Sequence, residues 1–152
     1  MKILDVLHKD AILIGLKSSD KEGVLRELVT PVAGISGIER EKLFQVLMER
    51  ELLGSTGIGA GIGIPHGKLK ALESLILAFG LSRNGVDFDS MDERPTHIFF
   101  LLLTPENSTG THLKILAQIS KILKNDYFKN QLMNAESSED VIFLLQEVDD
   151  DF

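Results

Sequence analysis

Two nearly unbroken apolar runs stand out in the pattern of hydrophobic and polar positions, at residues 75–81 (LILAFGL) and 97–103 (HIFFLLL). Runs of about seven residues that are rich in Ile, Leu and Phe are typical of strands covered on both faces. Asn84-Gly85 predicts a turn between them. Residues 11–16 (AILIGL) predict a third, shorter strand near the start of the chain.

The segments around these strands show the periodicity of amphipathic helices. Residues 19–22 (SDKE) have the spacing of a capping box and predict an amphipathic helix that ends near Pro31 or Gly34. Residues 36–39 (SGIE) repeat the capping pattern before a second helix. Two more helices are predicted, one over residues 111–124 and one that begins at Ser137 or Ser138 and continues through Leu145.

Helices that bracket several buried strands predict an α/β fold, in which a mixed β-sheet flanked by helices forms a three-layer sandwich. The mixture of short and long connections argues against an all-parallel sheet, because parallel neighbours need long crossovers. The chain has 152 residues, which is enough for one compact domain, and it shows neither an internal repeat nor a low-complexity linker. We therefore expect a single domain over residues 1–152.

Charge and composition narrow the functional classes. The chain carries 16 basic and 23 acidic residues, a formal net charge of −7, and no cysteine. This charge argues against nucleic-acid binding, which needs Lys and Arg to neutralise phosphates, and favours a basic protein partner. The absence of cysteine excludes disulfides and cysteine nucleophiles, and no apolar run approaches the ~18 residues of a membrane span, so we expect a cytoplasmic protein. A solvated acidic end is expected at the C-terminus, from Glu147, Asp149, Asp150 and Asp151.

Six glycines fall within residues 54–67 (GSTGIGAGIGIPHG), a stretch that ends at a histidine and its following glycine. Each glycine costs roughly 0.5–1 kcal/mol relative to Ala inside a regular element, so the stretch needs unusual dihedral angles or a close backbone approach. The dinucleotide fingerprint G-x-G-x-x-G fails in all three registers, because its last position is never glycine. A Walker A loop fails on both sides of Gly67-Lys68.

The residues just before His66 predict how this histidine is presented. We expect residues 62–64 to form a short strand, with His66 one residue beyond its end. Pro65 keeps the preceding residue extended, and Gly67 lets the chain turn away, which leaves one side of the imidazole open. Backbone N–H groups of the loop can form an anion-binding concavity beside it. This geometry suits a histidine that accepts or donates a phosphoryl group, and the alternative is a plain turn followed by a surface histidine.

Three motifs resemble those of one known family: residues 49–51 (ERE), 54–59 (GSTGIG) and 63–67 (GIPHG). They are similar to the enzyme IIA domains of the fructose, mannitol and nitrogen-regulatory class. These domains belong to the bacterial phosphoenolpyruvate-dependent phosphotransferase system (PTS). The similarity covers essentially the whole chain, and the free-standing nitrogen-regulatory members are the most alike.

The resemblance implies an α/β sandwich that works as a phosphocarrier, without a cofactor or a metal. Such domains accept a phosphoryl group on the histidine matching His66, at its tele nitrogen, from the phosphohistidine of a small carrier protein, HPr or its nitrogen-branch relative NPr. Sugar-transporting members pass the group to a cysteine of a IIB domain. His112 matches a second active-site histidine, and Arg50 matches an arginine that neutralises the phosphoryl group. The loop residues implied as phosphate ligands are Ser55, Thr56, Gly57 and Gly59.

Each of these site residues also has a simpler interpretation. His112 is alternatively a helix-start histidine, and Arg50 a cation that interacts with a helix C-terminus. Ser55 and Thr56 are alternatively hydroxyls that cap the turn. A zinc site built from His66 and His112 lacks a carboxylate at a telling spacing, so we expect no metal.

Three functional hypotheses follow from the sequence. The first is a phosphocarrier regulator, the second a sugar-specific IIA subunit that feeds a separate IIB protein, and the third a binding module that works without phosphotransfer. For a basic carrier we expect an apolar rim around His66, formed by Ile58 and Ile62. The remaining histidines, His8 and His97, are expected to be structural or exposed.

Overall fold

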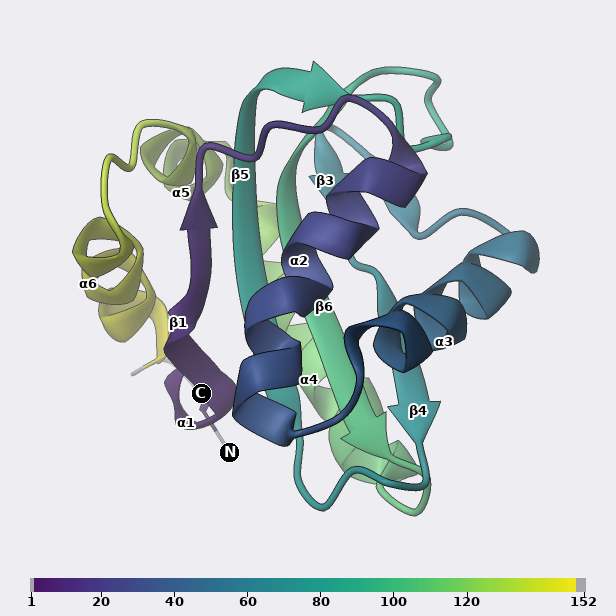
Figure 1. Cartoon of the computed structure of the whole chain (residues 1–152). Coiled ribbons are helices and arrows are strands. Elements are labelled where there is room, and N and C mark those ends of the chain that lie inside the picture. The colour runs from purple at the N-terminus through teal and green to yellow at the C-terminus, as the bar shows by residue number, and fades with distance from the viewer. Residues whose placement is uncertain (1, 150–152) are drawn as a thin grey trace.

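The computed structural model describes residues 2–149, and within them six strands form one mixed sheet (Figure 1). The strands are β1 (Leu7–Ile14), β2 (Gly57–Gly59), β3 (Ile62–Gly63), β4 (His66–Leu69), β5 (Ile76–Val86) and β6 (Thr96–Pro105). Their order is β1-β5-β6-β3-β2, and β4 pairs with β6 beyond the end of β3. Strands β5 and β6 are antiparallel, whereas β1 is parallel to β5 and both β3 and β4 are parallel to β6. The predicted mixed sheet is confirmed.

Helices cover both faces of this sheet and give the predicted three layers (Figure 1). On one face lie α2 (Lys21–Ser36) and α3 (Arg40–Leu52), and on the other lie α1 (Ile3–Val6), α4 (Thr109–Leu123), α5 (Asp126–Met133) and α6 (Ser138–Asp149). Alternate residues of β6 enter different cores, because Phe100 packs with α4 to α6 whereas its neighbours Phe99 and Leu101 pack with α2 and α3. No helix within residues 2–149 is long and apolar enough to cross a membrane.

The first long helix, α2, continues through Pro31 and ends at Ser36, close to the predicted end near Gly34. Pro31 removes one backbone hydrogen bond inside the helix. Its neighbours Val29 and Val32 are nevertheless fully buried against the sheet. Burial of an aliphatic side chain contributes about 1.5–3 kcal/mol, which offsets the cost of the proline.

Other boundaries also differ from the prediction, and β5 continues to Val86 through the predicted turn at Asn84-Gly85. Gly37 ends α2 in the left-handed region, at a φ of 74°, and residues 36–39 form no capping box, since the N-cap Glu39 makes no side-chain cap hydrogen bond. Strand β1 begins at Leu7, earlier than the predicted residues 11–16, and ends before Gly15, whose φ is 89°.

The expected solvated acidic end is wrong for Asp149, whose side chain is only 2% exposed. Its two carboxylate oxygens accept hydrogen bonds from the backbone N–H groups of Ile3 and Leu4, each at 2.9 Å. The first N–H groups of a helix have no partner within the helix, so this carboxylate satisfies two of them in α1. Glu147 is exposed as predicted, and Asp150 and Asp151 lie outside the described residues.

Candidate functional site

A pocket of about 470 Å³ opens at the edge of the sheet, where β4 lies between α3 and α4. It brings together three of the residues singled out in the sequence, His66, His112 and Arg50. Lys68 and Thr109 also line it. The three predicted residues come from β4, the first turn of α4 and the last turn of α3, so the fold assembles them from segments far apart in the chain.

The predicted short strand is β3, which ends at Gly63, so His66 lies beyond its end as predicted. The position of His66 is also fixed by a strand that was not predicted, since His66 begins β4. His66 pairs with Leu102 and Gly67 with Leu103. Because side chains alternate along a strand, His66 and Lys68 share one face of β4 while Gly67 faces α3. A Cβ atom at Gly67 would lie 2.7 Å from Val46 Cγ1, so the glycine permits the close approach of α3 to β4.

The imidazole of His66 is held through one nitrogen. Its Nδ1 lies 2.7 Å from the carbonyl oxygen of Ile64. A carbonyl only accepts hydrogen bonds, so Nδ1 carries the proton and the lone pair of the neutral ring is on Nε2. Burial lowers the pKa of His66, and the positive charge of Arg50 acts in the same direction. At neutral pH the ring is therefore uncharged.

His112 lies next to His66, with the ring centroids 5.3 Å apart and the ring planes at 65°. It is only 4% exposed, and its Nδ1 lies 2.8 Å from the hydroxyl of Thr104 on β6. Burial lowers the pKa of His112 from 6.5 to about 4, and the nearby His66 and Lys68 act in the same direction. Two neutral imidazoles thus lie side by side in the pocket.

Arg50 and Lys68 bring positive charge to the pocket. Arg50 Nη1 donates to the carbonyl of Gly54 at 2.9 Å, and Lys68 Nζ donates to the hydroxyl of Thr109 at 2.8 Å. Lys68 was not predicted as a site residue, although its position two residues after His66 places it on the same face of a strand. The strand itself could not be predicted, because the residues HGKL do not alternate between apolar and polar side chains.

The four predicted loop ligands do not line this pocket. The Ser55 hydroxyl donates to the carbonyl of Phe88 at 2.8 Å and accepts from the backbone N–H of Gly57 at 3.0 Å. Gly57 packs against Ser90, and Gly59 adopts a φ of 93° in the β2–β3 hairpin. In this structure the loop packs against residues 88–92 and does not surround His66.

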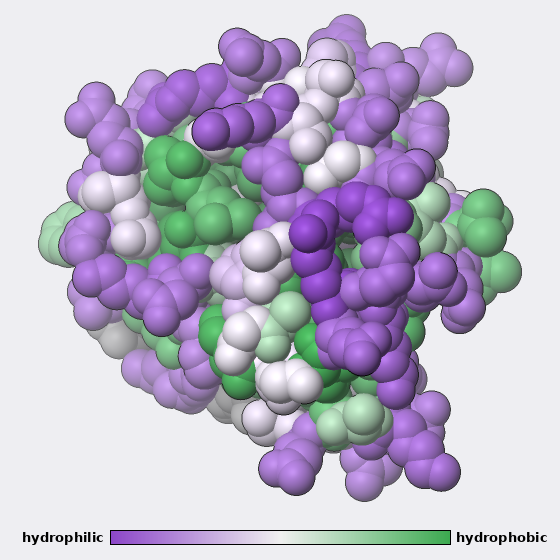
Figure 2. Space-filling view, viewed as in Figure 1, coloured by the Kyte–Doolittle hydropathy of each residue, from purple (hydrophilic) through white to green (hydrophobic). Residues whose placement is uncertain are grey.

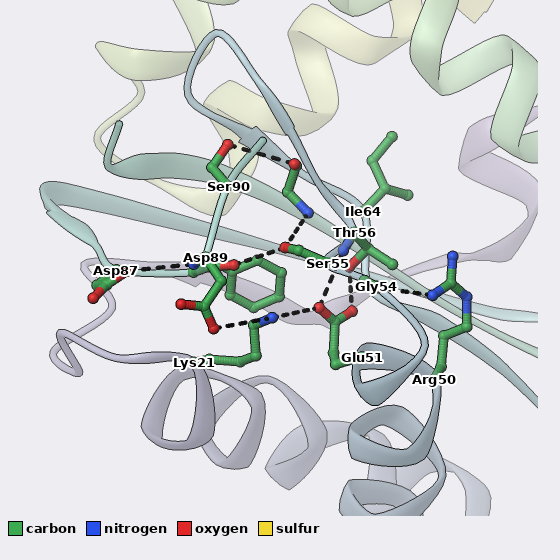
Figure 3. Close-up of polar contacts among 12 residues, drawn as sticks. Lys21, Arg50, Glu51, Gly54, Ser55, Thr56, Ile64, Asp87, Asp89 and Ser90 are labelled. Atoms are coloured by element: carbon green, nitrogen blue, oxygen red, sulfur yellow. Dashed lines mark hydrogen bonds and ion pairs between the residues drawn. The ribbon is translucent and has the colours of Figure 1, made fainter. Parts of the chain in front are cut away.

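Thr56 is held by a buried carboxylate (Figure 3). Glu51 is 6% exposed and accepts hydrogen bonds from the backbone N–H of Thr56, at 3.1 Å, and from its hydroxyl. Lys21 Nζ lies 2.9 Å from the same carboxylate and 3.5 Å from Asp89. Figure 3 shows Arg50 turned away from this cluster toward Gly54. Turn capping matches the contacts of the Ser55 hydroxyl, whereas the Thr56 hydroxyl donates to the side chain of Glu51.

The expected apolar rim of Ile58 and Ile62 is wrong. Ile62 is 4% exposed, because β3 pairs with β6 inside the sheet and directs this side chain into the core. Ile58 is exposed but lies outside the pocket. Apolar side chains from the helices line the pocket, among them the exposed Leu53 at the end of α3 and Leu113 on α4. Figure 2 shows apolar surface at the right edge of the molecule, over the C-terminal end of α3.

The other histidines lie outside the pocket. His97 Nδ1 lies 2.8 Å from the carbonyl of Ser82, and His8 is exposed on β1. Among residues 2–149, no group of three or more His, Asp or Glu side chains is arranged to hold a metal ion. The site is therefore a pocket at the edge of the sheet that contains two neutral imidazoles and two cationic side chains.

Comparison with known proteins identifies the family to which this chain belongs. Residues 5–148 match the family described as "Phosphoenolpyruvate-dependent sugar phosphotransferase system, EIIA 2", and the chain belongs to it. It is thus an EIIA phosphotransferase component and a phosphocarrier domain.

Three relatives illustrate the similarity. The nitrogen regulatory protein of Bradyrhizobium diazoefficiens is 37% identical over 145 residues, covering 95% of this chain and 95% of that protein. The PTS system fructose-specific EIIABC component of Bacillus subtilis is 36% identical over 150 residues, covering 98% of this chain but only 24% of that protein. The crystal structure of nitrogen regulatory protein IIA-Ntr from Neisseria meningitidis has a TM-score of 0.88 at 32% identity, covering 93% of this chain and 97% of that one.

Proposed function

We propose that His66 accepts a phosphoryl group on Nε2 from the phosphohistidine of an HPr- or NPr-type carrier, and that the chain acts as a regulatory IIA protein. The 2.7 Å contact between His66 Nδ1 and the Ile64 carbonyl carries this proposal. It leaves the Nε2 lone pair of a neutral imidazole available for attack. The ring lies in a pocket that also contains two cationic side chains, Arg50 and Lys68.

The transfer exchanges one phosphorus–nitrogen bond for another. His66 Nε2 attacks phosphorus in line with the carrier's imidazole, the bond to that imidazole breaks, and its electron pair returns to the carrier. Such a step is close to balanced and depends on positioning and charge stabilisation more than on acid–base catalysis. Arg50 and Lys68 offset the negative charge of the phosphoryl oxygens, and an N–H group of His112 donates to one of them.

The rim of the pocket suits a protein donor. Leu53 and Leu113 are 85% and 61% exposed, which is unusual for such large apolar side chains beside a polar site. A carrier that places its phosphohistidine in the pocket covers both. The net charge of −7 favours a basic carrier through electrostatic steering.

The choice of a regulatory role depends on similarity over the whole length. The nitrogen regulatory relative at 37% identity matches 95% of its own length. The fructose-specific relative, at 36% identity, supports the alternative: a sugar-specific IIA subunit that passes the phosphoryl group to a cysteine of a separate IIB protein. Either role belongs in the cytoplasm, where phosphoenolpyruvate is made.

Transfer of radiolabelled phosphate tests this proposal. Phosphoenolpyruvate, enzyme I and HPr or NPr are incubated with the wild type, with His66→Ala, and with His8→Ala as a control that removes an exposed histidine elsewhere. Acid-labile, base-stable label is expected on the wild type and on His8→Ala but not on His66→Ala. Loss of label to an added IIB protein would favour the sugar-specific role. A folded wild type that takes no label from either carrier would overturn the proposal and favour a binding module that works without phosphotransfer.

A further inference from the structure

Thr104 lies beneath the candidate site and contacts one of its two histidines. It belongs to β6 and pairs with Lys68 of β4, so it is adjacent to the strand that carries His66. Its side chain is fully buried, and its hydroxyl oxygen lies 2.8 Å from Nδ1 of His112, which is itself 4% exposed. Nothing in the proposed transfer step uses this hydroxyl.

The direction of this hydrogen bond follows from the partners available. Among residues 2–149, the only hydrogen-bond partner of the Thr104 hydroxyl is His112 Nδ1. If Nδ1–H donated, the hydroxyl proton would remain buried without an acceptor, which is unfavourable. If the hydroxyl donates, Nδ1 accepts and both groups are satisfied. Burial lowers the pKa of His112 to about 4, so the neutral ring required for an accepting Nδ1 is present at pH 7.

We propose that Thr104 is a positioning residue that fixes His112 in the tautomer with its proton on Nε2. This inference rests on the proposed function, because it assigns the N–H group with which His112 binds the phosphoryl group on His66. The two imidazoles are then held as opposite tautomers. His66 has its proton on Nδ1 and its lone pair on Nε2, whereas His112 has its lone pair on Nδ1 and its proton on Nε2. One ring attacks phosphorus and the other donates to an oxygen.

Removal of the hydroxyl isolates its contribution. Thr104→Val keeps the shape of the side chain but removes the donor, so that Nδ1 of His112 loses its partner and the ring is free to exchange tautomers. Thr104→Ser keeps the hydroxyl. The matched control is Thr96→Val, because Thr96 is also fully buried on β6 but its hydroxyl has no hydrogen-bond partner within residues 2–149.

Nitrogen-15 NMR of the imidazole rings at pH 7 tests the tautomer directly, with the His112 signals assigned by comparison with His112→Gln. We expect a protonated Nε2 and an unprotonated Nδ1 for His112 in the wild type, in Thr104→Ser and in Thr96→Val. Thr104→Val should show a mixture of tautomers. A protonated Nδ1 in the wild type, or an unchanged single tautomer in folded Thr104→Val, would overturn the inference.

Transfer kinetics provide the second test. We expect the maximal rate of phosphoryl transfer to His66 to fall about tenfold in Thr104→Val, with the carrier concentration at half-maximal rate unchanged, because the docking surface is intact. Thr104→Ser and Thr96→Val should retain rates close to that of the wild type. Equal rates for Thr104→Val and the wild type would contradict the inference. If the wild type takes no label, the proposed function fails, whereas the NMR measurement still decides the tautomer of His112. Should Thr104→Val fail to fold, the wild-type tautomer remains decisive.

Discussion

At the scale of single residues, the two histidines differ in what binds their Nδ1 atoms. His66 faces a carbonyl, which only accepts, and His112 faces a hydroxyl that has no other partner among the described residues. Burial lowers the pKa of each ring, so both are neutral at pH 7. Two uncharged rings at 5.3 Å avoid the repulsion of two imidazolium ions. Because both rings are neutral, Arg50 and Lys68 supply the positive charge for an incoming phosphoryl group.

The buried neutral state of His112 predicts how stability depends on pH. Its pKa is 6.5 when unfolded and about 4 when folded, so the unfolded state binds this proton first as the pH falls. The wild type should therefore lose stability progressively between pH 6.5 and pH 4. Denaturant unfolding across this range should show a steeper loss for the wild type than for His112→Gln, which lacks the titrating ring. Parallel curves for the two proteins would refute the assignment.

Lys68 provides a second prediction at this scale. Lys68→Met removes a cation from the pocket, and we expect transfer to His66 to slow about tenfold, which corresponds to about 1.4 kcal/mol. Lys68→Arg should keep most of the rate. Lys70→Met is the matched control, since Lys70 is exposed, lies just beyond β4 and does not line the pocket, but the change in net charge is the same. Equal slowing of both Met variants would show that only the overall charge matters.

At the scale of elements, apolar runs predicted the strands that form the centre of the sheet, because long buried strands carry a strong signal. Strand β4 was not predicted, since three of its residues line the pocket and only its last, Leu69, is buried in the core. The apolar rim was misplaced for a related reason: the alternation that buries Ile62 depends on pairing with Ile98, which lies far along the chain. The sequence around Ile62 does not indicate which distant strand will pair with it.

The contacts of the glycine-rich loop also depend on residues that are distant in the sequence, and they could not be predicted from it. In the sequence, Glu51 is one of several charged residues at a helix end. In the structure it is buried and binds both Lys21 and Thr56. A buried carboxylate requires such partners, because desolvation without them is costly. Lys21 begins α2, so its pairing with the end of α3 depends on how the two helices pack. The sequence motif could therefore single out Ser55 and Thr56 but could not predict the residues that their hydroxyls contact.

The close approach of α3 to β4 predicts an effect of Gly67→Ala. The new Cβ would lie 2.7 Å from Val46 Cγ1, so Val46 or the helix must move. Arg50 is one turn further along α3, so a shift of the helix displaces its guanidinium from the pocket. We expect about 1–3 kcal/mol of destabilisation and transfer slowed about tenfold.

The double variant Gly67→Ala/Val46→Ala tests the cause. Val46→Ala makes room for the added methyl group, so the double variant should transfer phosphate faster than Gly67→Ala alone. Denaturant unfolding and transfer rates are measured for all four members of the cycle. If the two effects are simply additive, the contact with Val46 does not position Arg50 and this explanation of the glycine is wrong.

At the scale of the whole molecule, the site lies at one edge of the sheet and the described chain ends lie near the opposite edge, by β1 (Figure 1). The N-terminal helix α1 is held there by Asp149 of α6, which accepts two backbone hydrogen bonds over 140 residues away in sequence. This link was invisible in the sequence, where Asp149 is one of several acidic residues at the C-terminus. Asp149 is thus separated from the side chains that line the pocket, and a change at this carboxylate should leave them intact.

Asp149→Asn tests this separation. The amide keeps one acceptor oxygen but directs an NH₂ group toward a backbone N–H, so one buried donor loses its partner. We expect destabilisation of about 1–3 kcal/mol, a fall in Tm of roughly 2–12 °C, while folded protein still takes phosphate at the wild-type rate. Glu147→Gln is the control, because Glu147 is exposed on the same helix and its change in charge is identical. A wild-type Tm for Asp149→Asn would mean that the cap contributes little to stability, and slower transfer by the folded variant would mean that the two edges of the sheet are coupled.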